Sequence, residues 1–367
     1  MDQAEALCRA ILRADAGHLV ALHLLAAVQT RLGRLQDALA SYDRVLAIKP
    51  DYPDALNNRG TALHDLHRFE DALASYEQAL AIKPDYVEAL NNRGNALRDL
   101  KRCEAALANY DQALAINPGH VEALINRGIA LQDLGRSNNA LASLDTALAI
   151  KPDHVEALFN RGIALQSLRQ FEAALAGYDK ALAIKPDHVG ALINRGNTLR
   201  HLKRFEEGLA SYDSALAIRS DNVEALINRG NLLRDLKRAE DALTSYGKAL
   251  AIKSDHVEAL ICRGAALRAL NRFDLALASL ERALAIEPQH RYAFPALADC
   301  ALNACDWTRT AKLEPGIRTH VEQQRSVIMP LTLLGYCSEP SLQLQCARSW
   351  LDDQIPVAPA PLWDQAV

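Results

Sequence analysis

Small and apolar residues recur along this chain in a pattern that repeats every 34 residues. With Pro53 taken as position 1, they stand at positions 4, 8, 11 and 14 of each unit, as in Leu56 and Gly60. A second set stands at positions 20, 21, 24, 27 and 28, as in Ala72 and Tyr76. Both spacings are those of one stripe of an amphipathic helix. The pattern therefore predicts an all-α chain with two helices per unit, joined by a short turn.

The register of this pattern also divides the chain. An Arg-Gly pair occupies positions 7 and 8 of seven successive units without a slip, from Arg59 and Gly60 to Arg263 and Gly264. A fixed period of this kind indicates one supersecondary module stacked on its neighbours, and it argues against a closed catalytic core. We expect a half-repeat helix at 1–18, eight tandem units over 19–290, a helical capping segment at 291–354 and a proline-rich tail at 355–367.

The boundaries between units carry start and stop signals. Pro84 and its counterparts follow the second helix, which a proline cannot continue. Next comes Asp with Glu three residues later, as in Asp85 and Glu88, which predicts a capping box at the next helix start. A histidine also recurs near these boundaries, and at one per unit the histidines are too far apart to share a metal ion. We interpret them as loop residues: His120, His154, His188, His256 and His290.

The repeated residues resemble the motif of the tetratricopeptide repeat family. Glycine in a helix interior costs about 1 kcal/mol relative to alanine, so its recurrence at position 8 predicts close helix packing. The resemblance covers about residues 1–290 and implies a right-handed superhelical solenoid with a concave groove. The motif is carried by the following residues and by their counterparts in the other units: Leu56, Gly60, Leu63, Ala72, Tyr76, Ala79 and Pro84.

Composition and charge narrow the class of protein. The formal net charge is −4, which disfavours nucleic acid as a partner. Seven cysteines form no C-x-x-C pair, and no run approaches the ~18 apolar residues of a membrane span. We therefore expect reduced thiols, no metal or cofactor, and no membrane partner. The acidic start Met-Asp-Gln-Ala-Glu does not resemble a signal peptide, which indicates a cytoplasmic protein.

Asparagine occupies position 6 in six successive units. It is a poor residue for a helix interior, and position 6 lies off the apolar stripe. Its amide offers two donors and an acceptor, so it suits the backbone of an extended peptide. With helices about 8–10 Å apart and a strand advancing about 3.3 Å per residue, one asparagine meets about every third ligand residue. The alternative is that the amides bridge neighbouring first helices and only stiffen the stack. The six residues are Asn58, Asn92, Asn126, Asn160, Asn194 and Asn228.

Position 13 lies on nearly the same helix face and is often acidic. Carboxylates there would bond Ser or Thr hydroxyls or basic side chains of a ligand, and the alternative is a solvated acidic face. Position 9 lies between the two rows, where Ile129 and Ile163 give the middle units an apolar patch. The arginines at position 7 form a further row, for which we favour structural packing. We include four acidic residues in the predicted peptide-binding face: Asp65, Asp99, Asp133 and Asp235.

The segment after residue 290 carries a second resemblance. The run Ala-Cys-Asp-Trp at 304–307, a helix start at Pro330 and the exit Pro-Leu-Trp at 361–363 are its motifs. They resemble the link between the repeats and the catalytic region in bacterial relatives of O-linked N-acetylglucosamine transferase, the SPINDLY-like group. In that family the position-6 asparagines line the groove that holds substrate polypeptides. No residue here matches the catalytic region of that family, so we expect a chain that is not an enzyme.

Three functions compete at this stage. The first is a scaffold that binds polypeptide ligands in the concave groove, as the substrate-recognition arm of such a transferase. The second is part of an active protein O-glycosyltransferase whose catalytic region lies beyond Val367. The third is a structural module that self-associates, for which a homodimer is the simplest form.

Overall fold

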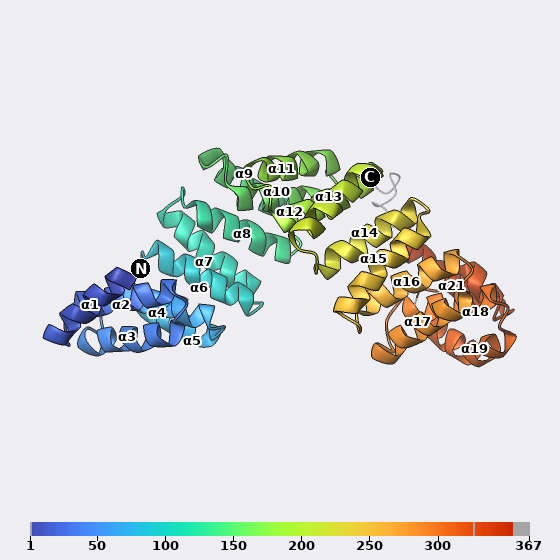
Figure 1. The fold of residues 1–367 in the computed structure, drawn as a ribbon, viewed down its shortest axis with the longest axis horizontal. Helices are drawn as coiled ribbons and strands as arrows, with labels where there is room; N and C mark the ends of the chain where they lie inside the picture. The colour runs from blue at the N-terminus through green and yellow to red at the C-terminus, as the bar shows by residue number, and fades with distance from the viewer. Residues whose placement is uncertain (1, 326, 355–367) are drawn as a thin grey trace, which may run out of the picture. The chain divides into compact units, whose positions relative to one another are not determined.

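The computed structural model describes residues 2–325 and 327–354, and within them it contains only helices (Figure 1). The chain divides into two compact units, Met1–Pro186 and Asp187–Val367, which are considered separately below. The all-α repeat architecture predicted from the sequence is confirmed.

The first unit contains the half-repeat helix and five helix pairs. The second contains three further pairs and the helices that follow the last repeat. In the first unit the helices are α1 (Asp2–Ala14), α2 (Leu19–Arg31), α3 (Leu35–Ile48), α4 (Pro53–Asp65), α5 (Phe69–Ile82), α6 (Val87–Asp99), α7 (Cys103–Ile116), α8 (Val121–Asp133), α9 (Ser137–Ile150), α10 (Val155–Ser167) and α11 (Phe171–Ile184). In the second unit they are α12 (Val189–His201), α13 (Phe205–Ile218), α14 (Val223–Asp235), α15 (Ala239–Ile252), α16 (Val257–Ala269), α17 (Phe273–Ile286), α18 (Ala293–Asn303), α19 (Trp307–Glu322), α20 (Pro330–Leu334) and α21 (Pro340–Gln354).

The turn between the two helices of a repeat has the same geometry throughout. In repeat 53–86 the amide of His67 donates to the carbonyl of His64, and the amide of Arg68 donates to that of Leu63. This pair of bonds ends the first helix in a Schellman-type turn, which requires a left-handed residue at position 15. That residue is glycine in two repeats, Gly33 and Gly135, and has a side chain in the others described.

Glycine at position 8 allows the two helices of a repeat to approach closely, as the sequence predicts. A Cβ added at Gly60 would lie 2.5 Å from Cε1 of Tyr76, the residue at position 24 of the same repeat. The same 2.5 Å approach is found between Gly94 and Tyr110. Tyr76 itself is fully buried. The glycines therefore make room for the large aromatic residue that fills the centre of each helix pair.

First helices of neighbouring repeats contact one another directly, as α4 and α6 do in the first unit and α14 and α16 in the second. Second helices of neighbouring repeats have no comparable contact in the parts of the chain that the structure describes. Each unit is therefore curved with its first helices on the inner side. We call this side the inner face.

The predicted capping box is wrong. Asp85 does not cap α6, because the N-cap residue is Tyr86. In four of the later repeats the N-cap is the boundary histidine, whose Nδ1 accepts a hydrogen bond from the amide three residues on, and in repeat 223–256 Asn222 takes its place. His120 accepts from Ala123 at 3.1 Å in this way. Four of the histidines interpreted as loop residues are therefore helix caps: His120, His154, His188 and His256.

After the last repeat, α18 packs on α17 and extends the apolar core of the repeats. The helices α19, α20 and α21 then build a small core of their own around Ala298, Ile317 and Leu333. The buried hydroxyl of Tyr336 donates to the carbonyl of Ala298 at 2.7 Å and ties this core to α18. The tail at 355–367 lies outside the described residues.

Candidate functional site

The asparagines of the first unit are joined to the preceding repeat. Nδ2 of Asn92 donates to Oδ1 of Asn57 at 3.1 Å, and Nδ2 of Asn126 donates to Oδ1 of Asn91 at 3.0 Å. Both acceptors stand at position 5 and are buried. For these two repeats the structure supports the bridging alternative, in which the amides connect neighbouring first helices.

The same connection begins at the first repeat with a histidine. Asn58 Nδ2 lies 3.4 Å from Nε2 of His23, which holds position 5 of repeat 19–52. Burial lowers the pKa of His23, and its Nδ1 is buried without a hydrogen-bond partner among the described residues. The neutral ring is therefore favoured, and it extends the row of bridged amides to the first repeat.

Asn160 differs from both of these cases. Its side chain is buried, and its Nδ2 donates to the carbonyl of Glu156 at 2.8 Å within the same helix. The backbone carbonyl of Asn160 accepts a hydrogen bond from Nε2 of Gln132 at 2.7 Å. Asn160 therefore stabilises α10 and its junction with α8.

Position 5 of the preceding repeat is apolar for both amides of the second unit, with Phe159 before Asn194 and Ile193 before Asn228, so it offers neither of them a side-chain acceptor. Asn194 and Asn228 are half-buried. Asn228 makes no hydrogen bond within residues 2–325 and 327–354. The oxygen of Asn194 accepts from Asn197 at 3.5 Å, and its amide nitrogen has no partner among the same residues. These two amides retain the hydrogen-bonding capacity that a ligand requires.

A shallow surface pocket of about 440 Å³ lies beside Asn228. It is formed where α14 meets the start of α16. The pocket combines the amide with apolar surface from Ile227 and with charged groups of both signs. Its lining residues are Val223, Glu224, Ile227, Asn228, Lys253, His256 and Glu258.

Two of the four predicted acidic residues bind basic groups of the preceding repeat. Oδ2 of Asp99 lies 2.8 Å from Nε2 of His64, and Oδ2 of Asp235 lies 2.6 Å from Nε of Arg200. Asp133 is exposed and makes no hydrogen bond or ion pair within the part of the chain that the structure describes. Asp65 is also exposed, with only a 4.0 Å approach to His64. The acidic row is thus partly neutralised and partly free.

In several repeats the residue at position 9 contacts the residue at position 24 of the same repeat. The hydroxyl of Tyr110 donates to Oδ1 of Asn95 at 2.7 Å, and that of Tyr246 to Oδ1 of Asn231 at 2.8 Å. Burial raises the pKa of Tyr76 to about 12, so such hydroxyls stay protonated and donate. Position 24 is leucine in repeat 121–154, where position 9 is the apolar Ile129. Ile129 therefore has a packing cause, whereas the repeat of Ile163 keeps a tyrosine, Tyr178, whose hydroxyl donates to Oε1 of Gln166 at 3.0 Å instead.

The arginines at position 7 connect second helices of successive repeats, which agrees with the structural interpretation. Nε of Arg59 lies 2.7 Å from Oδ1 of Asp43 in the preceding repeat, and Nη1 donates to Ser75 in its own repeat at 2.8 Å. Arg229 makes the same two contacts with Asp213 and Ser245. These arginines are not available to a ligand in the same way as the unpartnered amides.

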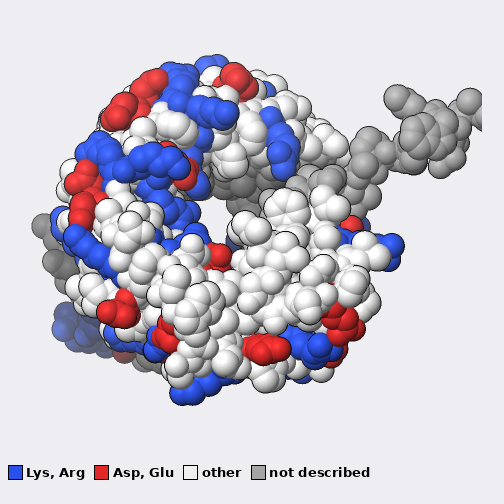
Figure 2. Space-filling view, turned by 90° about the vertical axis from the view of Figure 1, so that its right-hand side faces the viewer, with Lys and Arg blue, Asp and Glu red and all other residues white. Residues whose placement is uncertain are grey.

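Charged side chains of both signs are interspersed on the face viewed in Figure 2, with broad uncharged areas between them. Within residues 2–325 and 327–354, no group of three metal-ligating side chains comes together. All seven cysteines are free thiols. None of the described helices combines the length and apolar character that crossing a bilayer requires.

The structure also identifies residues that the sequence reasoning missed. Position 5 decides whether the amide at position 6 of the next repeat is bridged, and it contains His23, Asn57 and Asn91 at the beginning of the array. The change from Asn to Ile at position 5 is visible in the sequence. Its meaning depends on knowing that positions 5 and 6 meet across two repeats.

Comparison with known proteins supports the repeat assignment. Models of the tetratricopeptide repeat match residues 19–85, 51–119, 125–189, 188–255 and 257–290. No curated protein matches the chain.

Several solved structures share the fold. A tetratricopeptide repeat protein from Parabacteroides merdae is 20% identical, covers 67% of this chain and 97% of its own, and has a TM-score of 0.55. The APC/C hetero-tetramer Cut9–Hcn1 gives 16% identity, 82% and 58% coverage, and a TM-score of 0.57. Pseudomonas aeruginosa pilF gives 18% identity, 56% and 94% coverage, and a TM-score of 0.51. With its repeats matched from residue 19 to residue 290, the chain belongs to the tetratricopeptide repeat family, a known protein-binding scaffold.

Proposed function

We propose that this chain binds extended polypeptide segments along the inner face of its repeats. The observation that carries the proposal is Asn228, a half-buried helix residue whose amide makes no hydrogen bond to the described residues and lines a surface pocket. An asparagine in a helix interior is unfavourable by itself, so an unpartnered one is best explained by a ligand. Asn194, one repeat earlier, offers a second amide nitrogen on the same face.

The proposed ligand is recognised mainly through hydrogen bonds to its backbone. An amide donates to a peptide carbonyl and accepts from a peptide N–H, and neither bond depends on the ligand side chain. The repeat spacing places one amide at about every third residue of an extended strand. Asp133 and Asp65 are exposed acids at position 13, and we assign them to hydroxyl or basic side chains of the ligand. Asn58, Asn92 and Asn126 then contribute mainly by holding the first unit in shape.

We propose a non-catalytic role and a cytoplasmic setting for this binding. The seven free thiols fit a reducing compartment. As the finer proposal, the bound polypeptides are substrates of a glycosyltransferase. It is supported by the resemblance of the segment around Trp307 and Pro330, the residues with which α19 and α20 begin.

A library of extended Ser/Thr-rich peptides provides the test. Peptides that bind should protect backbone amides of the first helices α12 and α14 from hydrogen exchange more than those of α13 and α15. Protection confined to second helices would contradict the proposal. Light scattering with and without peptide separates ligand binding from the rival self-assembly function, because self-assembly raises the mass of the particle without peptide.

A further inference from the structure

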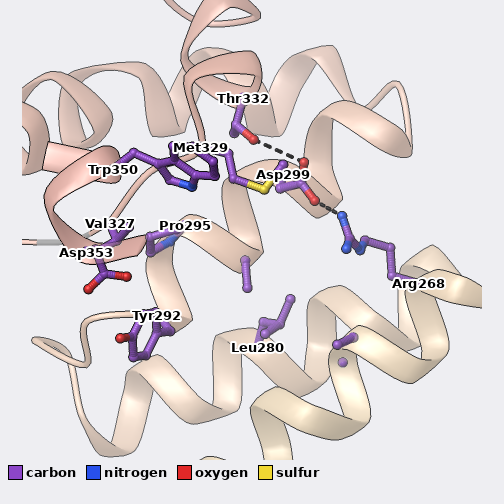
Figure 3. A pocket seen from close by; sticks show the side chains of 13 residues that line it. Arg268, Leu280, Tyr292, Pro295, Asp299, Val327, Met329, Thr332, Trp350 and Asp353 are labelled. Atoms are coloured by element: carbon purple, nitrogen blue, oxygen red, sulfur yellow. Dashed lines mark hydrogen bonds and ion pairs between the residues drawn. The ribbon is translucent and has the colours of Figure 1, made fainter. Parts of the chain in front are cut away.

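A cavity of about 280 Å³ lies between the last repeat and the helices that follow it (Figure 3). It is formed by α16 and α17 on one side and by α18, α20 with the segment before it, and α21 on the other. Figure 3 shows Trp350 and Met329 on one wall and Leu280 and Tyr292 on the opposite wall. The remaining lining residues are Gly264, Ala265, Arg268, Pro295, Ala296, Asp299, Val327, Thr332 and Asp353.

The cavity exists because repeat 257–290 lacks a pair of side chains that the preceding repeat has. In repeat 223–256 the ring of Tyr246 and the amide of Asn231 meet through a 2.8 Å hydrogen bond. The residues at the same positions here are Leu280 and Ala265. The loss of a phenol and an amide leaves space that no residue of the described chain fills.

The charged groups of the walls are already paired. Asp299 forms an ion pair with Arg268 and accepts from the hydroxyl of Thr332 at 3.1 Å. Asp353 forms an ion pair with Arg291 at 2.6 Å. Because each carboxylate faces its own guanidinium, the cavity has no uncompensated charge and favours a neutral occupant. The other walls are apolar or aromatic, which suits a flat ring.

The cavity continues the inner face on which we place the ligand. Ala265 and Arg268 stand at positions 9 and 12 of the repeat, where the previous repeat has Asn231 and Arg234. A strand bonded to Asn228 reaches the next repeat after about three residues. The ligand side chain about three residues from the one bonded to Asn228 is therefore next to the cavity.

We propose that this cavity receives one aromatic side chain of the polypeptide bound on the inner face. The proposal rests on the function proposed above and names a sequence requirement for the ligand. The size agrees, since a cavity of about 150 Å³ already admits benzene and small-molecule pockets begin near 300 Å³. The bound segment thus has an aromatic residue about three positions from the residue that Asn228 contacts.

The test uses 15-residue Ser/Thr-rich peptides with a single Phe at successive positions, and the same peptides with Ala instead. We expect one Phe position to strengthen binding roughly 10- to 100-fold over Ala, as burial of a large apolar side chain implies. Trp350 reports entry of the ring directly. With Trp307→Phe and Trp363→Phe, its emission is the only tryptophan signal, and it should change with the favoured Phe peptide alone.

The cavity can be filled with side chains that stand at the same positions in other repeats. Ala265→Asn with Leu280→Tyr rebuilds the pair of the preceding repeat and should abolish the preference for Phe. Ala265→Ile provides a milder filling, since isoleucine occupies the same position in two other repeats. The matched control is Ile129→Asn with Leu144→Tyr, the same rebuilt pair in the first unit, which should retain the preference.

Equal binding of Phe and Ala peptides to the unmodified chain would overturn the cavity proposal while leaving the proposed function intact. An undiminished Phe preference in both filled variants would overturn it as well. If neither peptide series binds, the proposed function fails and the cavity proposal fails with it.

Discussion

The first and second units have the same asparagine at position 6 but use it differently. In the first unit Asn92 and Asn126 donate to Asn57 and Asn91 and connect neighbouring first helices. In the second unit Asn228 faces no such acceptor and keeps its amide unpaired within the described residues. A row of identical residues therefore has more than one role. Position 5 of the preceding repeat decides whether the amide bridges, and an amide without that acceptor bonds within its own helix, as Asn160 does, or stays unpaired among the described residues, as Asn228 does. Repetition in sequence does not imply repetition of function.

The comparison assumes that the two units share one framework. The largest effect we expect tests that assumption through Gly94→Ala and Gly230→Ala. In each case the new Cβ would lie 2.5 Å from Cε1 of the partner tyrosine, Tyr110 or Tyr246. Overpacking of this kind costs about 1–3 kcal/mol, which exceeds or offsets the ~1 kcal/mol that alanine gains in a helix. Chemical denaturation should show a similar loss for both variants.

A clear difference between the two glycine variants would mean that the frameworks are not equivalent. The comparison of the asparagines would then lose its basis. Gly247→Ala is the matched control, because no atom lies within 4 Å of a Cβ at that position. It should stabilise the chain by about 1 kcal/mol.

A substitution that gives the first unit the unpaired amide of the second unit should have a smaller effect, on peptide affinity. Asn91→Ile gives repeat 87–120 the residue found at position 5 of four of the five later repeats, and it releases the amide of Asn126. One additional neutral hydrogen bond to a peptide is worth about 0.5–1.5 kcal/mol, or roughly 2- to 10-fold in affinity. Fluorescence anisotropy with a binding peptide measures the change. The gain should vanish when Asn126→Ala is added, and a gain that persists would contradict the mechanism.

The smallest effect concerns pH. Burial lowers the pKa of His23 below the ordinary histidine value of about 6.5. The unfolded chain therefore binds a proton more readily, and the contribution of His23 to stability is lost as pH falls from about 6.5 to its folded pKa. His23→Asn supplies the acceptor that Asn57 provides in the next repeat, so it should flatten this fall while retaining the bridge.

Thermal unfolding between pH 7.5 and pH 5 compares the two chains. His320, whose pKa burial also lowers, is present in both, so the difference isolates His23. An equally steep loss of stability in His23→Asn would show that His23 does not contribute to the pH dependence.

Much of the fold is predictable from the sequence because the period of 34 residues fixes the helices and the close contact at Gly60. The helix caps are not predictable in the same way. The Asp-x-x-Glu pattern at Asp85 and Glu88 is typical of a capping box, but the N-cap of α6 is one residue later than Asp85. The candidate surface was predictable only as a set of residues. Asn92 forms a bridge and Asn228 does not. The difference depends on the residue at position 5 of the preceding repeat, and a local sequence pattern does not show that these two positions meet.

The most direct test compares two double variants in thermal unfolding and peptide affinity. Asn92→Ala with Asn126→Ala removes donors from the buried Asn57 and Asn91. An unsatisfied buried acceptor costs about 1–3 kcal/mol, so stability should fall while peptide affinity stays nearly unchanged.

Asn194→Ala with Asn228→Ala should give the opposite result. The melting temperature should hold or rise, because alanine is the better helix former, and affinity should fall roughly 5- to 100-fold through two lost hydrogen bonds. If this second variant instead loses stability and keeps its affinity, the inner-face amides of the second unit are structural and the proposed binding surface is wrong.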